Sequence, residues 1–373
     1  MRFETLAVHA GGEPDPETGA ISPPIHLATT FRHGPAGERI AGFEYVREGS
    51  PTQDRLETAL ATLEGGAAAL AFGSGMAAMT ALLESLPAGT TLLMPSDCYT
   101  GLRVLAEEFL PRGGIHTRRI DTTDLAAVEA GLGAGAGAIW LETPSNPQLQ
   151  VSDITAIVEI ARRHGASVFC DNTFATPVLQ QPLALGADVV MHSTTKYFGG
   201  HSDVMGGALV FARRDALFDR VAHRRHVTGG VLAPFNAWMT LRGLRSLPAR
   251  MRWHCANAQR IAEFLSDHSR IAAVNYPGLT SHAGHAVAQR QMRDFGAMLS
   301  FRVAGGREAA LAAAGRLKLI HNATSLGGCE TLIEHRASVE GAVPVSPQDL
   351  LRLSVGLEHA DDLVADLDQA LSG

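Results

Sequence analysis

Residues 189–207, with the sequence VVMHSTTKYFGGHSDVMGG, join a short apolar run to a polar, glycine-rich loop that contains Lys196. The apolar run is typical of a strand buried on both faces of a sheet. Lys196 taken alone is typical of a surface lysine just after a strand. Its neighbours Ser193 and Thr195 favour another interpretation, because their hydroxyls suit a phosphate held close to the amine. Burial or nearby positive charge makes such an amine nucleophilic, so the stretch predicts a reactive lysine at the end of a strand.

Four similar apolar runs precede the run that opens this stretch, and the five runs alternate with helical patterns. The runs lie at 67–72, 90–95, 138–143, 167–172 and 188–193, and the helical patterns at 51–64, 75–86 and 153–165. This alternation predicts an α/β fold around a large parallel or mixed sheet. Because ligands collect at the carboxyl ends of parallel strands, we expect Glu142, Asp171 and Ser193 to lie at one site.

The pattern differs at both ends of the chain. Residues 1–47 carry glycine, proline and few periodic apolar positions, which predicts an extended arm. After a boundary near residue 232, a long helical region leads to the strand patterns AMLSFRV and LLRLSV. We therefore expect an arm (1–47), a large domain (48–231) and a smaller C-terminal α+β domain (232–373). The glycine- and alanine-rich stretch 131–138 is expected to be a loop.

Composition and charge exclude several classes of protein. The net charge of −7 argues against a general nucleic-acid binder, and the basic cluster 223–226 (HRRH) is interpreted as a solvated helix face. The N-terminus lacks the apolar core of a signal peptide, and no stretch approaches the roughly 18 apolar residues of a membrane span. The four cysteines form no CxxC pair, which is typical of reduced thiols. These features predict a cytoplasmic protein that binds neither nucleic acid nor membrane.

Further features fit an enzyme that uses pyridoxal 5'-phosphate (PLP). Phosphate favours the backbone N–H groups at a helix start, which the turn at 73–76 (GSGM) provides between a strand and a helix. Asp171 is placed to face the pyridine nitrogen, and Tyr99 to stack on the ring. Arg352 suits a substrate carboxylate, because a planar guanidinium can donate two parallel hydrogen bonds to a carboxylate. With Lys196 forming a Schiff base, these residues predict a PLP enzyme that acts on an amino acid.

Nearly the whole chain resembles the Cys/Met-metabolism PLP enzymes, which include cystathionine γ-synthase, the cystathionine lyases and methionine γ-lyase. The resemblance is carried by YVREGSPTQDRLETALATLEGG, SGMAA, ETPSNPQLQVSDI, DNTFATPVLQQPLALGADVVMHSTTKYFGGHSDVMGG and SLGGCETLIEHRAS. The lysine segment is very specific, because the fold alone does not demand its order of residues. The resemblance implies the PLP-dependent transferase fold of type I and an obligate dimer, usually paired into a tetramer.

The resemblance also implies a role for each candidate residue. Lys196 would bind the cofactor and then move protons, Asp171 would pair with the pyridinium, and Tyr99 would stack on the ring and serve as an acid or base. The remaining residues are Gly75, Met76, Ser193 and Thr195 for the phosphate, Tyr45 and Arg47 for the phosphate of a neighbouring subunit, and Asn146, Ser325 and Arg352 for the substrate carboxylate. Glu142 matches a family position without an assigned role.

Three departures from the family pattern affect the expected substrate. Thr100 and Gly101 replace a glycine pair after the stacking tyrosine, and a cysteine of methionine γ-lyases is missing nearby, which argues against that activity. Thr324 replaces a glutamate that members handling cystathionine often carry. The segment 335–341 (HRASVEG) replaces one that ends in Thr-His. We expect the reaction class to survive these changes and one wall of the pocket to differ.

Three hypotheses about function follow. The first is γ-replacement on an activated homoserine ester with a thiol, most simply cysteine, to give cystathionine. The second is β- or γ-elimination from cystathionine or a related sulfur amino acid, which releases ammonia and a keto acid. The third is PLP binding without useful catalysis. No metal is expected, because His282 and His285 in SHAGH have no third ligand clustered beside them.

Overall fold

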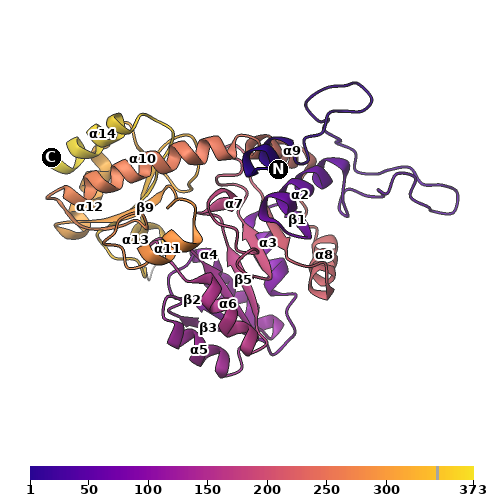
Figure 1. The fold of residues 1–373 in the computed structure, drawn as a ribbon, viewed down its shortest axis with the longest axis horizontal. Helices are drawn as coiled ribbons and strands as arrows, with labels where there is room; N and C mark the ends of the chain where they lie inside the picture. The colour runs from indigo at the N-terminus through magenta and orange to yellow at the C-terminus, as the bar shows by residue number, and fades with distance from the viewer. Residues whose placement is uncertain (342–343) are drawn as a thin grey trace.

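The larger part of the molecule is built on a seven-stranded sheet (Figure 1). The computed structural model describes residues 1–341 and 344–373. The strands of this sheet are β1 (Ala68–Phe72), β2 (Thr91–Pro95), β3 (His116–Ile120), β4 (Ala138–Glu142), β5 (Ser167–Asp171), β6 (Val189–His192) and β7 (Gly207–Phe211). Their spatial order is β1-β7-β6-β5-β4-β2-β3.

Most neighbouring strands of the large sheet are parallel, from β3 through β2, β4 and β5 to β6. β7 runs antiparallel to both β6 and β1, so the sheet is mixed. The expected α/β fold is confirmed, and each of the five apolar runs forms a strand. β3 lies outside the expected set because it is an edge strand with the polar sequence HTRRI, which carries no apolar run.

Helices cover both faces of the large sheet. They are α2 (Pro51–Glu64), α3 (Gly75–Leu83), α4 (Thr100–Val104), α5 (Leu125–Gly133), α6 (Ile154–Arg163), α7 (Thr176–Leu179) and α8 (Ala216–Thr228), with the short turns η1 (Leu105–Phe109) and η2 (Leu110–Gly113) after α4. One core cluster includes Met79 of α3 and Phe218 of α8, and another includes Val128 of α5 and Ile157 of α6. A parallel sheet covered in this way leaves the carboxyl ends of its strands as the place for a site.

The C-terminal part is built on a second sheet of five strands. In chain order they are β8 (Ile271–Asn275), β9 (Met298–Val303), β10 (His321–Asn322), β11 (Leu332–His335) and β12 (Leu350–Ser354). The helices are α9 (Pro234–Leu244), α10 (Leu247–Asp267), α11 (His285–Gln291), α12 (Gly306–Arg316), α13 (Arg336–Val339) and α14 (Ala360–Ser372). The long helix α10 runs from the large part to the second sheet (Figure 1). This part is the smaller α+β domain of the expected fold class.

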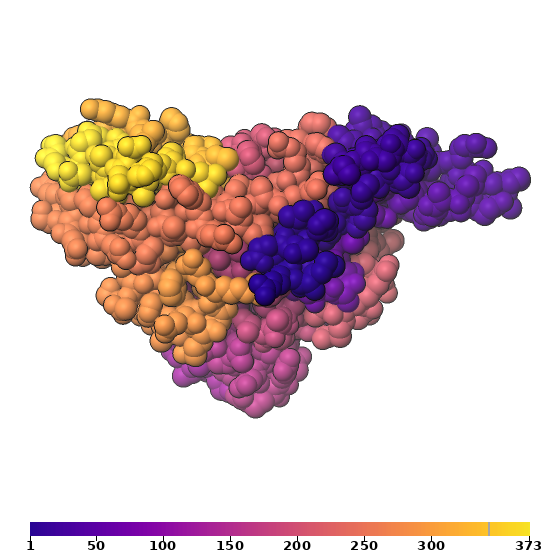
Figure 2. Space-filling model, turned by 45° about the horizontal axis from the view of Figure 1, so that its top comes forward, coloured from indigo at the N-terminus to yellow at the C-terminus, as the bar shows by residue number. Residues whose placement is uncertain are grey.

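The N-terminal residues form a short helix followed by a projecting arm. Helix α1 (Phe3–His9) packs against α2, so the first residues are helical where an extended arm was expected. The residues that follow project from the body of the molecule (Figures 1 and 2). The arm exposes Ile21, Leu27 and Ile40 by 72%, 69% and 62%. Apolar side chains this exposed are typical of a surface that contacts another chain.

Two local expectations differ from the structure. Helix α5 continues to Gly133, so the stretch 131–138 is a helix end, a short connection and the first residue of β4. In the basic cluster 223–226 on α8, Arg225 is buried and pairs with Glu57 at 2.5 Å. Arg225 also donates to the carbonyl oxygen of Ala71 at 2.9 Å. It therefore fixes α8 against the large sheet and is not part of a solvated face.

Two observations bear on the expected setting of the protein. All four cysteines are free thiols. Among the described residues, none of the helices combines the length and apolarity needed to span a bilayer.

Candidate active site

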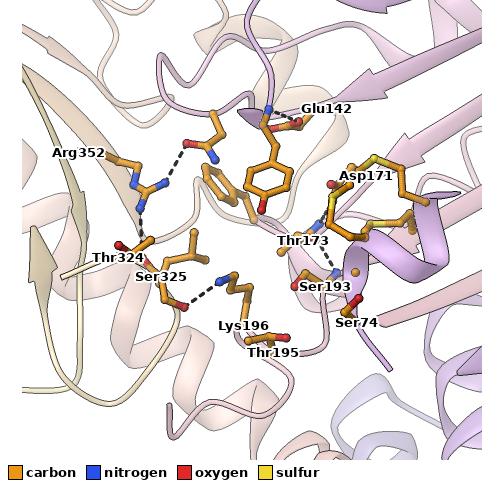
Figure 3. Close-up of a pocket in the computed structure, with 18 of the residues that line it drawn as sticks. Ser74, Glu142, Asp171, Thr173, Ser193, Thr195, Lys196, Thr324, Ser325 and Arg352 are labelled. Atoms are coloured by element: carbon orange, nitrogen blue, oxygen red, sulfur yellow. Dashed lines mark hydrogen bonds between the residues drawn. The ribbon is translucent and has the colours of Figure 1, made fainter. Parts of the chain in front are cut away.

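A cavity of about 300 Å³ lies at the carboxyl ends of β4, β5 and β6, facing residues of the C-terminal sheet (Figure 3). This volume is at the lower end of ordinary small-molecule sites. The predicted site residues that line it are Gly75, Met76, Tyr99, Asn146, Asp171, Ser193, Thr195, Lys196, Ser325 and Arg352. The structure thus brings together ten residues that are spread over nearly the whole chain.

Lys196 lies at the centre of the cavity, in the loop between β6 and β7. Its Nζ donates a hydrogen bond to Ser325 Oγ at 2.7 Å (Figure 3). Burial, with a smaller contribution from Arg352, lowers the pKa of the Lys196 amine from 10.5 to about 8. Roughly a tenth of the amine is then neutral at pH 7, far more than for an ordinary lysine, and the neutral form is the nucleophile and proton acceptor.

The loop that carries Ser325 approaches the lysine loop very closely. Gly327 has a φ of +76°, and a Cβ added there would lie 2.7 Å from the backbone nitrogen of Tyr197. Glycine is therefore required at this contact. Ser325 itself has a φ of +96°, which is uncommon for a residue with a side chain. Such strain persists where surrounding contacts hold it, and it clusters at functional sites.

Asp171 lies at the end of β5 and is buried. One carboxylate oxygen accepts the backbone N–H of Thr173 at 2.9 Å. Burial raises the pKa of Asp171, while the hydrogen bonds from Thr173 oppose that rise. A positively charged N–H in the cavity would stabilise the carboxylate against this desolvation. The pyridinium of PLP is such a group, so Asp171 fits the cofactor.

The first turn of α3 forms the end of the cavity that suits a phosphate. Ser74 caps the helix by accepting the N–H of Ala77 at 3.0 Å. Gly75 and Met76 occupy the first helical positions, whose N–H groups have no partner within a helix and attract anions. A Cβ on Gly75 would lie only 3.0 Å from Ser193 Cβ, so glycine keeps this cradle open.

The two hydroxyls predicted for the phosphate differ in their present bonding. Thr195 Oγ1 donates to the carbonyl of Gly206 at 3.2 Å and accepts its N–H at 3.1 Å. Thr195 therefore closes the lysine loop as well as lining the cavity. The backbone N–H of Ser193 donates to Thr173 Oγ1 at 2.9 Å. Ser193 itself lines the cavity, so its hydroxyl is available to a ligand there. Thr173 thus contacts the residues that flank both ends of the cofactor site.

Tyr99 and Glu142 are joined through the backbone. Glu142, at the end of β4, accepts the N–H of Tyr99 at 2.9 Å. Burial and the nearby Asp171 carboxylate raise the pKa of Glu142 well above its usual range. The Tyr99 side chain is 43% exposed and lines the cavity. Glu142 is therefore a positioning residue that fixes the start of α4 and, with it, the tyrosine.

The opposite end of the cavity suits a carboxylate. Arg352 on β12 donates to Asn146 Oδ1 at 3.0 Å and to the backbone oxygen of Ser325 at 3.1 Å. It also pairs with Glu334 on β11 at 2.9 Å. Burial lowers the pKa of Arg352 to about 10, an effect that Glu334 opposes and Arg336 increases. A buried arginine held in this way can bind the carboxylate of a ligand in addition to that of Glu334.

Tyr45 and Arg47 lie outside the residues that line the cavity. The Arg47 guanidinium donates to the backbone oxygen of His226 at 2.9 Å and lies over the Tyr45 ring, 5.3 Å from its centre. Tyr45 is 43% exposed. The single chain therefore does not bring these two residues to its own site.

Three residues important to the site were absent from the expected set. Thr173 lies two residues after Asp171, so the strand end gave a local signal for it. Glu334 pairs in register with Arg352 across β11 and β12. A charged residue within each of two apolar strands is a signal for such a buried pair. Arg336 lines the cavity from the segment 335–341, where the sequence departs from the family pattern.

His282 and His285 bond to backbone groups of their own region. His282 Nδ1 accepts the N–H of Gly284 at 3.0 Å, and His285 Nδ1 lies 2.8 Å from the carbonyl oxygen of Pro277. In the part of the chain that the structure describes, no cluster of three or more potential metal ligands occurs.

Comparison with known proteins places this geometry among related enzymes. The family model for Cys/Met metabolism PLP-dependent enzymes matches residues 4–372. The chain is 48% identical to cystathionine gamma-synthase of Mycobacterium tuberculosis (strain ATCC 25618 / H37Rv), over 98% of this chain and 96% of that protein. It is 41% identical to cystathionine gamma-lyase of Bacillus subtilis (strain 168), over 100% and 99%. The structure of cystathionine gamma synthase from Xanthomonas oryzae pv. oryzae in complex with cystathionine matches with a TM-score of 0.95 and 42% identity, over 100% of this chain and 98% of that chain.

Proposed function

The chain belongs to the family of Cys/Met metabolism PLP-dependent enzymes, and from that premise we propose that it catalyses γ-replacement on an activated homoserine ester. The incoming group is a thiol such as cysteine, and the product is then cystathionine. The broader class, a PLP-dependent transsulfuration enzyme, follows from the family itself. The observation that carries the proposal is the Lys196 amine, which lies 2.7 Å from Ser325 Oγ and beside the arginine suited to a substrate carboxylate.

The residues of the cavity have complementary tasks in holding PLP. The bound cofactor supplies an electron-poor ring that makes the protons of the attached amino acid acidic. Asp171 would accept the ring N–H, and Lys196 would be the point of covalent attachment. The N–H groups of Gly75 and Met76 at the start of α3 and the Ser193 hydroxyl would hold the phosphate.

Lys196 would also move protons to and from the bound substrate, because its amine would then be free. Arg352 and Asn146 hold the substrate carboxylate, and because Ser325 contacts both Arg352 and Lys196, the substrate α-carbon lies near the lysine. The amine would take the proton from Cα, give that proton up again, and only then take a second proton from Cβ. Departure of the γ-substituent then opens the γ-carbon to a thiol. A pKa of about 8 suits an amine that both accepts and returns protons.

Replacement is favoured over elimination by the relatives. The synthase of M. tuberculosis is 48% identical to this chain, against 41% for the lyase of B. subtilis. The second candidate, elimination from a sulfur amino acid, is favoured by Thr324, which lines the cavity without a carboxylate for the ammonium group of a second amino acid. Both reactions would begin with removal of the Cα proton by Lys196. In γ-replacement a thiol then adds to the γ-carbon, in γ-elimination no thiol adds, and β-elimination needs no chemistry at the γ-carbon.

The active unit is proposed to be at least a dimer in the cytoplasm. The arm exposes apolar side chains and carries Tyr45 and Arg47 outside the chain's own cavity. Both residues would complete the phosphate site of a neighbouring subunit, because Arg47 supplies the charge that a phosphate requires. Free thiols at Cys98, Cys170, Cys255 and Cys329 suit a reducing compartment.

Product analysis by mass spectrometry tests the proposed reaction. The PLP-loaded enzyme is given O-succinyl- or O-acetylhomoserine, with and without cysteine, and cystathionine separately. Cystathionine that forms only with cysteine supports γ-replacement. A keto acid from cystathionine, without any thiol adduct from the esters, shows instead that the protein is a lyase. A spectrum of bound PLP that no amino acid changes would support the non-catalytic alternative.

A further inference from the structure

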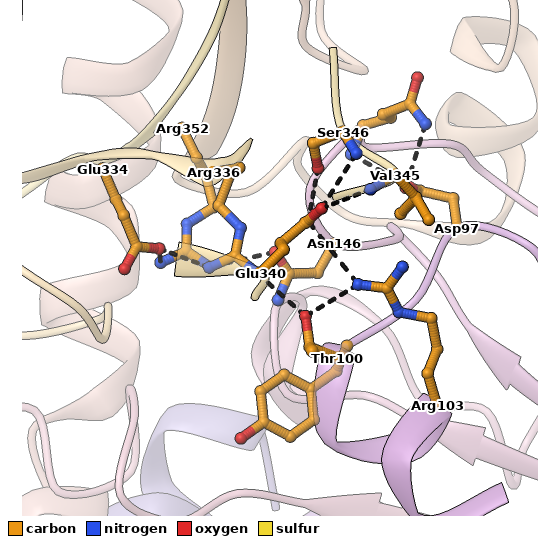
Figure 4. Close-up of polar contacts among 12 residues, drawn as sticks. Asp97, Thr100, Arg103, Asn146, Glu334, Arg336, Glu340, Val345, Ser346 and Arg352 are labelled. Atoms are coloured by element: carbon orange, nitrogen blue, oxygen red, sulfur yellow. Dashed lines mark hydrogen bonds and ion pairs between the residues drawn. The ribbon is translucent and has the colours of Figure 1, made fainter. Parts of the chain in front are cut away.

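Two departures from the family pattern, 236 residues apart, meet beside the cavity. Arg336, from the segment 335–341, donates to Thr100 Oγ1 at 3.3 Å (Figure 4). Arg103, one helical turn after Thr100, donates to the same hydroxyl at 3.1 Å. Two guanidinium groups therefore converge on the residue that follows Tyr99. Arg336 lines the pocket, and Thr100 and Arg103 bond together beside it; this group is called the arginine wall below.

The charges of this wall do not balance among the residues that form it. Arg336 and Arg352 share one oxygen of Glu334, at 2.5 Å and 2.9 Å. Glu340 lies 3.7 Å from Arg336 and 3.8 Å from Arg103. Three buried guanidiniums thus face two carboxylates within this group. Glu142 also acts on Arg352 from across the cavity, but burial raises its pKa well above the usual range, so an added anion would still stabilise the third guanidinium.

Donor groups in the wall are also left without partners. The side chains of Arg336 and Arg103 are only 7% and 9% exposed. Within the described residues, the buried Nε–H groups of both arginines have no hydrogen-bond partner. Arg336 lines the cavity itself, so an anionic ligand can reach it. Since each guanidinium carries five N–H donors, this wall has spare capacity for a carboxylate.

We propose that Arg336, supported by Arg103, determines specificity by binding a second carboxylate of the reacting molecules, apart from the one held by Arg352. The proposal rests on the proposed function and assigns a chemical class to its substrate. The second carboxylate belongs either to the acyl group that leaves, as in a dicarboxylic half-ester, or to the incoming thiol. In both cases a neutral analogue without that carboxylate leaves the guanidinium of Arg336 unpaired and binds less tightly.

Ligand binding tests the subsite without any turnover. Dissociation constants of the PLP-loaded enzyme are measured by calorimetry for L-2-aminosuberate and L-2-aminooctanoate, which differ in a terminal carboxylate or methyl and lack a leaving group at the γ-carbon. We expect the carboxylate ligand to bind about 10- to 100-fold more tightly, as bonds to a buried charge predict. Equal binding, or a preference of the wild-type enzyme for the methyl ligand, overturns the proposal and needs no variant.

Variants then assign the preference to one side chain. Arg336→Gln should abolish it, Arg336→Lys should keep part of it, and Arg302→Gln, at a half-exposed ion pair on β9, should leave it unchanged. An Arg336→Gln enzyme that keeps the preference contradicts the proposal. If Arg336→Gln does not fold, the wild-type comparison and Arg336→Lys still decide.

Kinetics distinguish the two sources of the carboxylate. A loss of kcat/KM in Arg336→Gln with O-succinylhomoserine but not with O-acetylhomoserine places the leaving acyl group at Arg336. A loss with cysteine but not with cysteamine places the incoming thiol there. An enzyme that turns over neither ester yet keeps the Arg336-dependent preference for L-2-aminosuberate refutes the γ-replacement reaction and leaves the subsite supported.

Discussion

The Nζ of Lys196 lies 2.7 Å from the Oγ of Ser325, although 129 residues separate them in the chain. The lysine comes from the loop after β6 of the large sheet, and the serine from the loop that precedes β11 of the C-terminal sheet. The backbone oxygen of the same serine accepts a hydrogen bond from Arg352. One residue therefore links the amine that we propose moves protons to the guanidinium that we propose holds the substrate carboxylate.

Ser325→Ala should lower kcat/KM about tenfold, because it removes a hydrogen bond to an ionisable amine. Ser325→Gly removes the same hydroxyl and also relieves the backbone strain at a φ of +96°. If both variants lose activity equally while the glycine variant is at least as stable to heat, the hydroxyl is the cause. Ser266→Ala in α10 is the matched control, since its hydroxyl bonds only to the carbonyl of Ala262. Full activity in Ser325→Ala would refute a role for this contact.

Lys196→Ala should abolish turnover, with kcat reduced at least about 10²- to 10⁴-fold as expected for loss of an acid–base group. It should also abolish covalent attachment of PLP. The chain has only two lysines, Lys196 and Lys318, so Lys318→Ala is a natural control. Lys318 is exposed. Borohydride reduction of the loaded enzyme, followed by peptide mapping, should place the cofactor on Lys196 alone. A label on Lys318 in the active enzyme would be contrary to this assignment.

Capture of PLP by the cofactor-free protein should speed up as pH rises through about 8. The neutral amine is the reacting form, and burial lowers the pKa of Lys196 from 10.5 to about 8. The rate should therefore level off above that pH, whereas an ordinary lysine would continue to gain reactivity toward 10.5. Glu334 raises the pKa of Lys196, so Glu334→Gln should move the midpoint to lower pH. Stopped-flow absorbance gives the profile, and a rate that still climbs steeply above pH 9 or so would contradict the shift.

Arg47→Ala should weaken PLP binding roughly tenfold or more if its guanidinium reaches the phosphate of another subunit. Arg39→Ala is a control in the same arm, because Arg39 pairs with Glu44 and Glu48. Co-expression of Arg47→Ala with Lys196→Ala should restore activity, since one site of each mixed dimer then has both residues intact. Absence of recovery in isolated mixed dimers would show that Arg47 serves its own chain or no site.

Much of the active site could be predicted from the sequence because its residues follow strand ends. Asp171 is the last residue of β5, and Lys196 lies in the loop that follows β6. Parallel strands bring their carboxyl ends to one edge. The turn at Gly75 preceded a helix, so its affinity for an anion could also be inferred. In each case the signal lies within a few residues of the functional group.

Other features depend on contacts between distant segments. The sequence shows that 335–341 departs from the family pattern, but only the fold places Arg336 against Thr100 and Arg103. The buried state of Arg225 likewise follows from its pairing with Glu57, which a local basic cluster cannot reveal. Charge balance within a pocket is a property of neighbours in space, so local patterns do not contain it.

The sequence by itself was enough to predict the α/β fold class, the PLP cofactor and Lys196 as the reactive lysine, because periodicity, strand ends and short motifs carry these signals locally. Tertiary structure alone decided which side chains face Lys196 and how the arginines are paired. It also excluded Tyr45 and Arg47 from the chain's own cavity. These outcomes depend on how two sheets pack together, and packing brings together residues whose separation along the chain carries no signal.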